Sequence, residues 1–138
     1  MLPLVILGAL AGCGADTAGG VGRVAGPPPK EPLATREVQL QRDIVPILAT
    51  SCSGEYCHGA AMTTAAGAYS YLVNQPALEC EDGRVLVAPG RPDQSYLVDK
   101  VLQGHLCAGQ PMPRGIENQL SGREIAMLVD WIQEGAPR

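Results

Sequence analysis

Cys52-Ser53-Gly54-Glu55-Tyr56-Cys57-His58 is the stretch that decides how this chain folds and what it can do. It places two thiols with four residues between them and sets an imidazole directly after the second thiol. Thiols and imidazoles bond covalently to other groups and bind soft metal ions. The adjacency of Cys57 and His58 matters most, because it fixes the ring relative to a sulfur.

The chemistry that needs these residue types side by side is covalent attachment of a c-type haem. The usual signature has two residues between the cysteines, whereas this chain has four. Each thiol adds to one vinyl group of the porphyrin, and the imidazole takes the proximal position on the iron. A longer loop can bulge outward and still present both sulfurs. We therefore expect Cys52 and Cys57 to hold haem and His58 to bind its iron.

Two other interpretations of the same residues stay open. Cys52 and Cys57 would form a local disulfide in an oxidising compartment, which leaves His58 without a role. Alternatively, these three residues would bind zinc with additional ligands. The additional ligands on offer are Cys80, His105 and Cys107. The spacing disfavours zinc, because the close cysteine and histidine pairs of known zinc modules are missing.

The N-terminus predicts export and lipid attachment. Residues 1–12 are uncharged and mostly apolar, too short for a membrane-spanning helix of about 20 residues and typical of a signal peptide. Leu10-Ala11-Gly12-Cys13 resembles a bacterial lipobox, which implies cleavage before Cys13 and lipidation of its thiol. Gly14 follows instead of aspartate, and this resemblance then favours the outer membrane, facing the periplasm. No Lys or Arg precedes Arg23, so a buried apolar strand is the alternative.

Composition separates residues 13–35 from residues 36–138. The first segment is rich in Gly, Ala and Pro, so we expect a flexible tether. The second is the right size for one domain. The chain has 14 acidic and 10 basic residues, a net charge of −4 and no basic cluster, which argues against nucleic acid as a partner. With no Phe and one Trp, such a small domain needs a staple, and an apolar haem would serve.

Each of the five cysteines can be assigned to a lipid, to haem or to a disulfide. Cys13 goes to lipid and two cysteines go to haem, which leaves Cys80 and Cys107 to form a disulfide in an oxidising compartment. That disulfide would stabilise the domain by about 3 kcal/mol on the chain-entropy estimate. The same count also permits a second disulfide at Cys52 and Cys57, or free thiols at Cys80 and Cys107.

Apolar spacing predicts an all-α fold, a small helical domain built around one covalent haem. Helices are expected over residues 40–50, 93–103 and 121–135, with a short helix or turn over residues 69–73 and a short extended run over residues 84–89. Asp43 is expected to cap the first helix and Pro46 to lie in its first turn. The last helix has the clearest signal, because Ser121 and Glu124 match a capping box. Trp131 is expected to pack that helix against the first.

Gln110-Pro111-Met112-Pro113 offers a second iron ligand in the loop before the last helix. Proline fixes φ and restricts the preceding residue, so Met112 is held in a defined direction at low entropic cost. Methionine opposite histidine raises the reduction potential of a haem. The alternatives are that Met112 is only a loop hydrophobe, or that His105 binds the iron and gives a lower potential. Met62 and Met127 are weaker competitors, because the first follows His58 closely and the second lies in mid-helix.

The motifs in their order along the chain resemble a known family. They are Cys-x4-Cys-His-Gly, Val87-Ala88-Pro89-Gly90-Arg91-Pro92-Asp93-Gln94-Ser95-Tyr96-Leu97, Met112-Pro113 and Trp131-Ile132-Gln133-Glu134-Gly135-Ala136. This pattern is similar to the small class I cytochrome c domains of secreted lipoproteins from environmental Gram-negative bacteria, over about residues 37–136. The resemblance implies that Cys52 and Cys57 attach haem, that His58 is the proximal ligand and that Met112 is the distal ligand. The four-residue gap is the main departure.

The function expected from these features is a monohaem electron carrier, not an enzyme. Its partners would be redox proteins, and its membrane contact would be the lipid on Cys13. The alternative is a haem-free, disulfide-stapled envelope lipoprotein that acts as an interaction module, which leaves His58 unused. A peroxidase-like enzyme would need an open distal site and an acid–base residue, for which only His105 is available.

Overall fold

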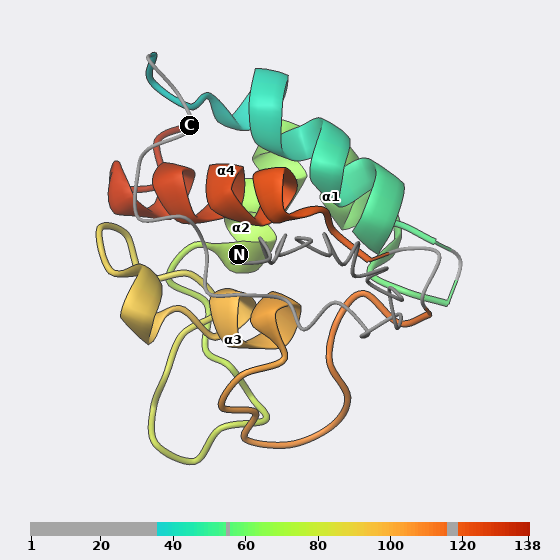
Figure 1. Cartoon of the computed structure of the whole chain (residues 1–138), viewed down its shortest axis with the longest axis vertical. Coiled ribbons are helices and arrows are strands. Elements are labelled where there is room, and N and C mark those ends of the chain that lie inside the picture. Colours follow the sequence, from blue (N-terminus) through green and yellow to red (C-terminus); the bar gives the residue numbers. More distant parts are fainter. Residues whose placement is uncertain (1–35, 55, 116–118) are drawn as a thin grey trace, which may run out of the picture.

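The computed structural model describes residues 36–54, 56–115 and 119–138, which form a small helical domain (Figure 1). In this part of the chain, regular structure is helical, and extended pairing is limited to isolated bridges. The predicted all-α class is confirmed at that level. The predicted signal peptide and tether, with Cys13, lie outside the described residues. None of the described helices is long and apolar enough to cross a membrane.

The helix that leads into the cysteine segment is present, but it begins with a different geometry. Leu40–Ile44 form a π-helical turn, and α1 follows as Val45–Cys52. Pro46 lies in the first turn of α1 as predicted, where its missing N–H is harmless. The helix runs past the predicted end at residue 50, so that Cys52 occupies its last position.

The prediction that Asp43 caps this helix is wrong in its details. Gln39 is the N-cap residue, and the Asp43 carboxylate accepts the Gln39 N–H at 2.9 Å from within the first turn. The same carboxylate forms ion pairs with Arg36 at 3.0 Å and Arg42 at 2.7 Å. Asp43 therefore stabilises the start of the domain from inside the first helical turn, and not from the N-cap position.

Two helical segments follow the cysteine segment. Gly59–Thr63 form a 3-10 turn, and α2 follows as Ala65–Leu72, longer than the predicted short helix. Thr64 caps α2, because its side chain accepts the Gly67 N–H at 3.1 Å. A Cβ on Gly67 would lie 2.6 Å from the Ala61 carbonyl oxygen. The small side chains here let the 3-10 turn and α2 pack closely together.

The helix predicted over residues 93–103 is divided in two. Pro92–Gln94 form a 3-10 turn and α3 follows as Tyr96–Leu102, because extended Ser95 interrupts the run. The Ser95 hydroxyl accepts the Ala88 N–H at 2.9 Å. Residues 84–89 are partly extended, as predicted, and two of them form bridges to neighbouring segments.

The last helix, α4, spans Gly122–Gln133 and begins with the predicted Ser121–Glu124 capping box. It crosses α1 and α2, while α3 lies on its other side (Figure 1). Trp131 is fully buried and its indole N–H donates to the Pro137 carbonyl at 2.9 Å. The core of the described residues is one apolar cluster. Burial of each large apolar side chain in it stabilises the fold by about 1.5–3 kcal/mol. The cluster includes Leu40, Ile44, Leu48, Leu72, Leu128, Trp131 and Ile132.

Candidate functional site

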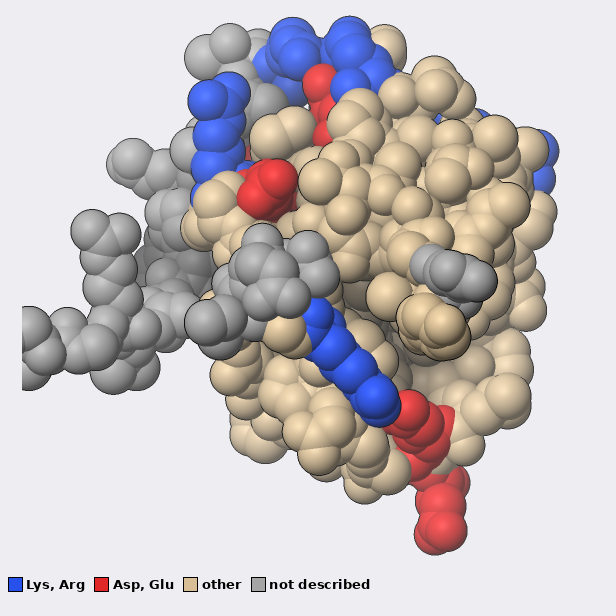
Figure 2. All heavy atoms as spheres, turned by 90° about the vertical axis from the view of Figure 1, so that its right-hand side faces the viewer, with Lys and Arg blue, Asp and Glu red and all other residues tan. Residues whose placement is uncertain are grey.

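Two adjoining hollows open where the end of α1 meets the loop before α4. Their volumes are about 230 Å³ and 210 Å³, and they share Cys52, His58, Met112 and Pro113 in their walls. Cys57 lines the smaller hollow. Residues predicted from separate motifs are thus gathered at one place. This side of the molecule, at the right in Figure 1, faces the viewer in Figure 2, where uncharged side chains cover most of the surface.

The walls of the larger hollow are mainly apolar. Aliphatic side chains come from α1, α2, α3 and the loop between α2 and α3, namely Leu48, Leu72, Leu78, Leu86, Leu97 and Val101. Several large apolar side chains stay open to solvent: Tyr56 is 97% exposed, Leu78 93% and Tyr71 41%. Each of these three lines one of the two hollows. Exposed apolar side chains grouped in this way are typical of binding surfaces, so these hollows are the candidate site.

The cysteine segment folds back on itself despite its long gap. The His58 N–H donates to the Cys52 carbonyl at 3.0 Å, and the Cys57 N–H donates to the Gly54 carbonyl at 2.8 Å. These bonds close the loop while Tyr56 projects outward. The backbone of Cys52 is thus brought next to that of His58 across the longer gap, while presentation of both sulfurs to a haem stays a prediction.

Both cysteines of this segment are free thiols. Cys57 is exposed, whereas Cys52 is half-buried at the end of α1. Burial, with a smaller contribution from neighbouring Cys57, raises the pKa of the Cys52 thiol to about 11. Cys52 is therefore a neutral thiol at physiological pH, held in an apolar wall.

His58 has a partner that the sequence did not indicate. Its Nδ1 lies 3.1 Å from the Tyr71 hydroxyl, and the two rings meet edge-on with centroids 5.5 Å apart. A histidine that binds a metal through one nitrogen usually places a hydrogen-bond partner at the other. Contact with Tyr71 thus leaves Nε2 as the nitrogen for a metal ion.

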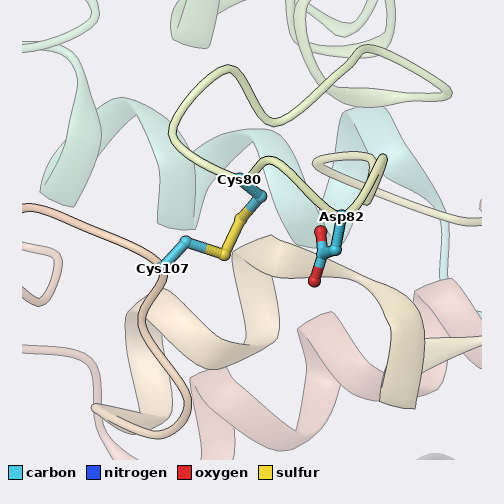
Figure 3. A group of neighbouring side chains, drawn as sticks. All are labelled: Cys80, Asp82 and Cys107. Carbon is cyan, nitrogen blue, oxygen red and sulfur yellow. A yellow bond between two sulfur atoms is a disulfide. The ribbon is translucent and has the colours of Figure 1, made fainter.

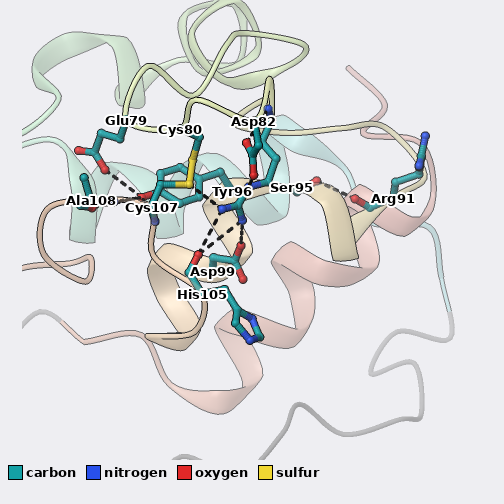
Figure 4. Close-up of polar contacts among 11 residues, drawn as sticks. Glu79, Cys80, Asp82, Arg91, Ser95, Tyr96, Asp99, His105, Cys107 and Ala108 are labelled. Carbon is teal, nitrogen blue, oxygen red and sulfur yellow. Dashed lines mark hydrogen bonds and ion pairs between the residues drawn. A yellow bond between two sulfur atoms is a disulfide. The ribbon is translucent and has the colours of Figure 1, made fainter.

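Met112 is the methionine whose position fits the hollows best. It is half-buried, lines both hollows and is held by a hydrogen bond from its N–H to the Lys100 carbonyl at 3.0 Å. Met62 also lines the larger hollow but is 2% exposed and belongs to the core. Met127 packs on the core within α4. His105 is exposed and lines neither hollow, and its ring points away from the surrounding polar contacts (Figure 4).

The predicted disulfide between Cys80 and Cys107 is present. With Asp82 these sulfurs form the one cluster of His, Cys, Asp or Glu ligand atoms found in the described residues (Figure 3). It offers little to a cation, because the sulfurs are bonded to each other and Asp82 is paired with Arg84 at 2.9 Å. The zinc alternative gains no support, because this cluster excludes the Cys52–His58 segment.

Comparison of the chain with known protein families, with curated proteins and with solved structures found no match.

Proposed function

We propose that this chain is a monohaem c-type cytochrome, an electron carrier similar to class I cytochrome c domains. The observation that carries the proposal is the common location of Cys52, Cys57, His58 and Met112 around two adjoining hollows with apolar walls. The exposed apolar side chains at these hollows would be covered by a flat apolar ligand. A haem bound there would also enlarge a core that is poor in aromatic residues.

The two free thiols fit covalent attachment. Each S–H would add across one vinyl double bond of the haem, with the sulfur bonded to one carbon and the hydrogen to the other. The reaction needs thiols, which Cys52 and Cys57 are in this structure. The bond between the His58 N–H and the Cys52 carbonyl keeps the two anchor points and the histidine together.

The remaining roles follow from position. His58 would bind iron through Nε2 while Tyr71 orients the ring through Nδ1. Met112, which lines the same two hollows, would supply a soft thioether ligand. When bound, haem supplies one-electron chemistry. If His58 and Met112 both bound the iron, no site on the metal would stay open to a substrate, so we expect electron transfer without catalysis.

The partners and location follow as parts of the same proposal. A net charge of −4 favours weak docking to a basic redox protein. A lipid on Cys13 and the tether over residues 13–35 would hold the domain near a bacterial envelope membrane, on the periplasmic side and by lipobox resemblance at the outer membrane.

A second candidate is a haem-free envelope lipoprotein that acts as an interaction module. The Cys80–Cys107 disulfide favours it, because the domain already has a staple without any cofactor. This alternative gives the exposed apolar surface to a protein partner and leaves His58 and Met112 without a role.

The decisive experiment uses the full chain with Cys13→Ser, produced in a bacterial host that carries cytochrome c maturation proteins. The purified chain is unfolded and its absorption spectrum recorded. We expect haem colour that stays with the unfolded chain and is lost in the Cys52→Ser/Cys57→Ser variant, with thioether-type bands on reduction. A colourless parent chain would overturn the proposal in favour of the interaction module.

A further inference from the structure

Lys100, in α3, is a buried lysine whose hydrogen bonds and ion pair are with Glu79 and with residues 108–112, here called the Met112 loop. It is 8% exposed, and lysine is rarely so buried unless its ammonium is paired. Its Nζ donates to the carbonyls of Ala108 at 3.1 Å and Gln110 at 3.2 Å, and it forms an ion pair with Glu79. An ammonium has three N–H donors, and these partners satisfy them.

The backbone near Met112 is shaped to reach this ammonium. Gly109 has a φ of +73°, and a Cβ there would lie 3.2 Å from a Glu79 carboxylate oxygen and 3.4 Å from Lys100 Nζ. Glycine adopts this left-handed conformation without steric cost and leaves room for the ammonium. The Lys100 carbonyl meanwhile accepts the Met112 N–H at 3.0 Å. One residue therefore holds the loop by its side chain and by its backbone.

Tyr96 lies one turn before Lys100 on α3, and its hydroxyl contacts Glu79 and Cys107 (Figure 4). It is 1% exposed, its hydroxyl lies 3.0 Å from a Glu79 carboxylate oxygen and accepts the Cys107 N–H at 3.2 Å. The Lys100 ammonium lies 5.2 Å from the centre of the Tyr96 ring, within range of a cation–π contact. Hydrogen bonds from Lys100, which has the larger effect, and from Tyr96 hold the pKa of the Glu79 carboxyl below its usual range. The loop is thus docked on α3 by charged and neutral hydrogen bonds together.

We infer that Lys100 is the positioning residue for Met112. This inference rests on the proposed function, because it concerns a methionine that binds haem iron. Holding the loop in place removes the conformational entropy that each encounter of sulfur with iron would otherwise cost. Without the ammonium, the Gln110 carbonyl loses this donor, the Ala108 carbonyl keeps the Tyr96 hydroxyl at 3.2 Å, and Glu79 loses its ion pair with Lys100. The loop would then open more often, and the Met112 sulfur would leave the iron more often.

The test compares Lys100→Met with Arg123→Met in the full, haem-loaded chain. Both changes remove one positive charge and introduce methionine, but Arg123 is exposed in the first turn of α4. Lys100→Met keeps the aliphatic stem. We expect equal covalent haem, a weakened far-red methionine–iron band in the oxidised form and about tenfold faster carbon monoxide binding by the reduced form. Arg123→Met should match the parent in all three.

Two further variants separate positioning from general stability. Leu128→Ala removes part of the core, where burial losses of about 2–5 kcal/mol are usual, and should leave the methionine–iron band unchanged at room temperature. Gly109→Ala leaves Lys100 in place but obstructs its approach, so it should weaken the band even if Lys100→Met gives no folded protein. Folded, haem-loaded Lys100→Met or Gly109→Ala protein with the parent's band and carbon monoxide kinetics would overturn the inference. Absence of haem from the parent chain itself would instead overturn the proposed function, and this inference with it.

Discussion

Removal of the Cys80–Cys107 disulfide gives a prediction whose size follows from the structure. The bond joins residues separated by 27 positions. It connects the loop between α2 and α3 to the segment just before the Lys100-bound carbonyls. The double change Cys80→Ser/Cys107→Ser is the suitable perturbation, because either single change leaves an unpaired thiol that would compete during haem attachment.

The expected loss of folding stability comes mainly from the effect of the disulfide on the unfolded chain. Closing a loop of this length lowers the entropy of the unfolded state enough to stabilise the fold by about 3–4 kcal/mol. In the native state, Lys100 and Tyr96 still hold the neighbouring segment, so the folded geometry should change little. A domain of this size has a total stability of about 5–15 kcal/mol and should remain folded. Its melting temperature should fall by about 12–30 °C.

Urea unfolding of the haem-loaded chain, with and without the disulfide, measures the loss directly. We expect the free energy of unfolding to fall by about 3–4 kcal/mol while the methionine–iron band persists at room temperature. A loss below about 1 kcal/mol, outside the range expected of a native disulfide, would refute this reasoning. Loss of the band in the folded protein would show that the disulfide, rather than Lys100, positions the loop.

Two further substitutions and two measurements on the haem-free chain test separate parts of the site. Met112→Ala should lower the reduction potential and let the reduced protein bind carbon monoxide at least about tenfold faster; an unchanged potential would exclude Met112 as a ligand. Tyr71→Phe removes the hydroxyl partner of the proximal histidine and should raise the potential, whereas Tyr69→Phe, in the same helix beside Arg138, should not; equal potentials would exclude this role. In the haem-free chain, iodoacetamide should modify Cys57 well before Cys52, because at pH 8 roughly one Cys52 in a thousand is a thiolate when its pKa is about 11. Since folding raises the Cys52 pKa from 9.0 to about 11, the haem-free chain should also lose stability as pH rises from 9 toward 11; equal modification rates, or equal urea midpoints at pH 8 and pH 11, would contradict this.

Local signals in the sequence predicted the elements whose stability is local. The Ser121–Glu124 capping box is set by side chains three residues apart, and it forms as expected. The start of α1 depends on contacts that the local pattern does not contain. The Asp43 carboxylate forms ion pairs with Arg36 and Arg42, and the first turn is π-helical. Ser95 likewise leaves the helical run because its hydroxyl bonds to the Ala88 N–H in another segment.

The same distinction holds for the site. The Cys52–His58 segment and Met112 could be found from the sequence, because their residue types and neighbours are unusual. Tyr71 and Leu78 could not, because they reach the hollows only when α2 and the loop after it fold back on α1. Lys100 follows an aspartate in a short helix and resembles a solvent-facing charge until the chain brings the Ala108 and Gln110 carbonyls to it.

The most direct test of covalent haem attachment is the intact mass of the Cys13→Ser chain secreted from a host with cytochrome c maturation. The account predicts a chain heavier by one haem, with the added mass on the peptide that contains Cys52 and Cys57. A chain with no added haem, and lighter by the four hydrogens lost in two disulfides, would contradict it.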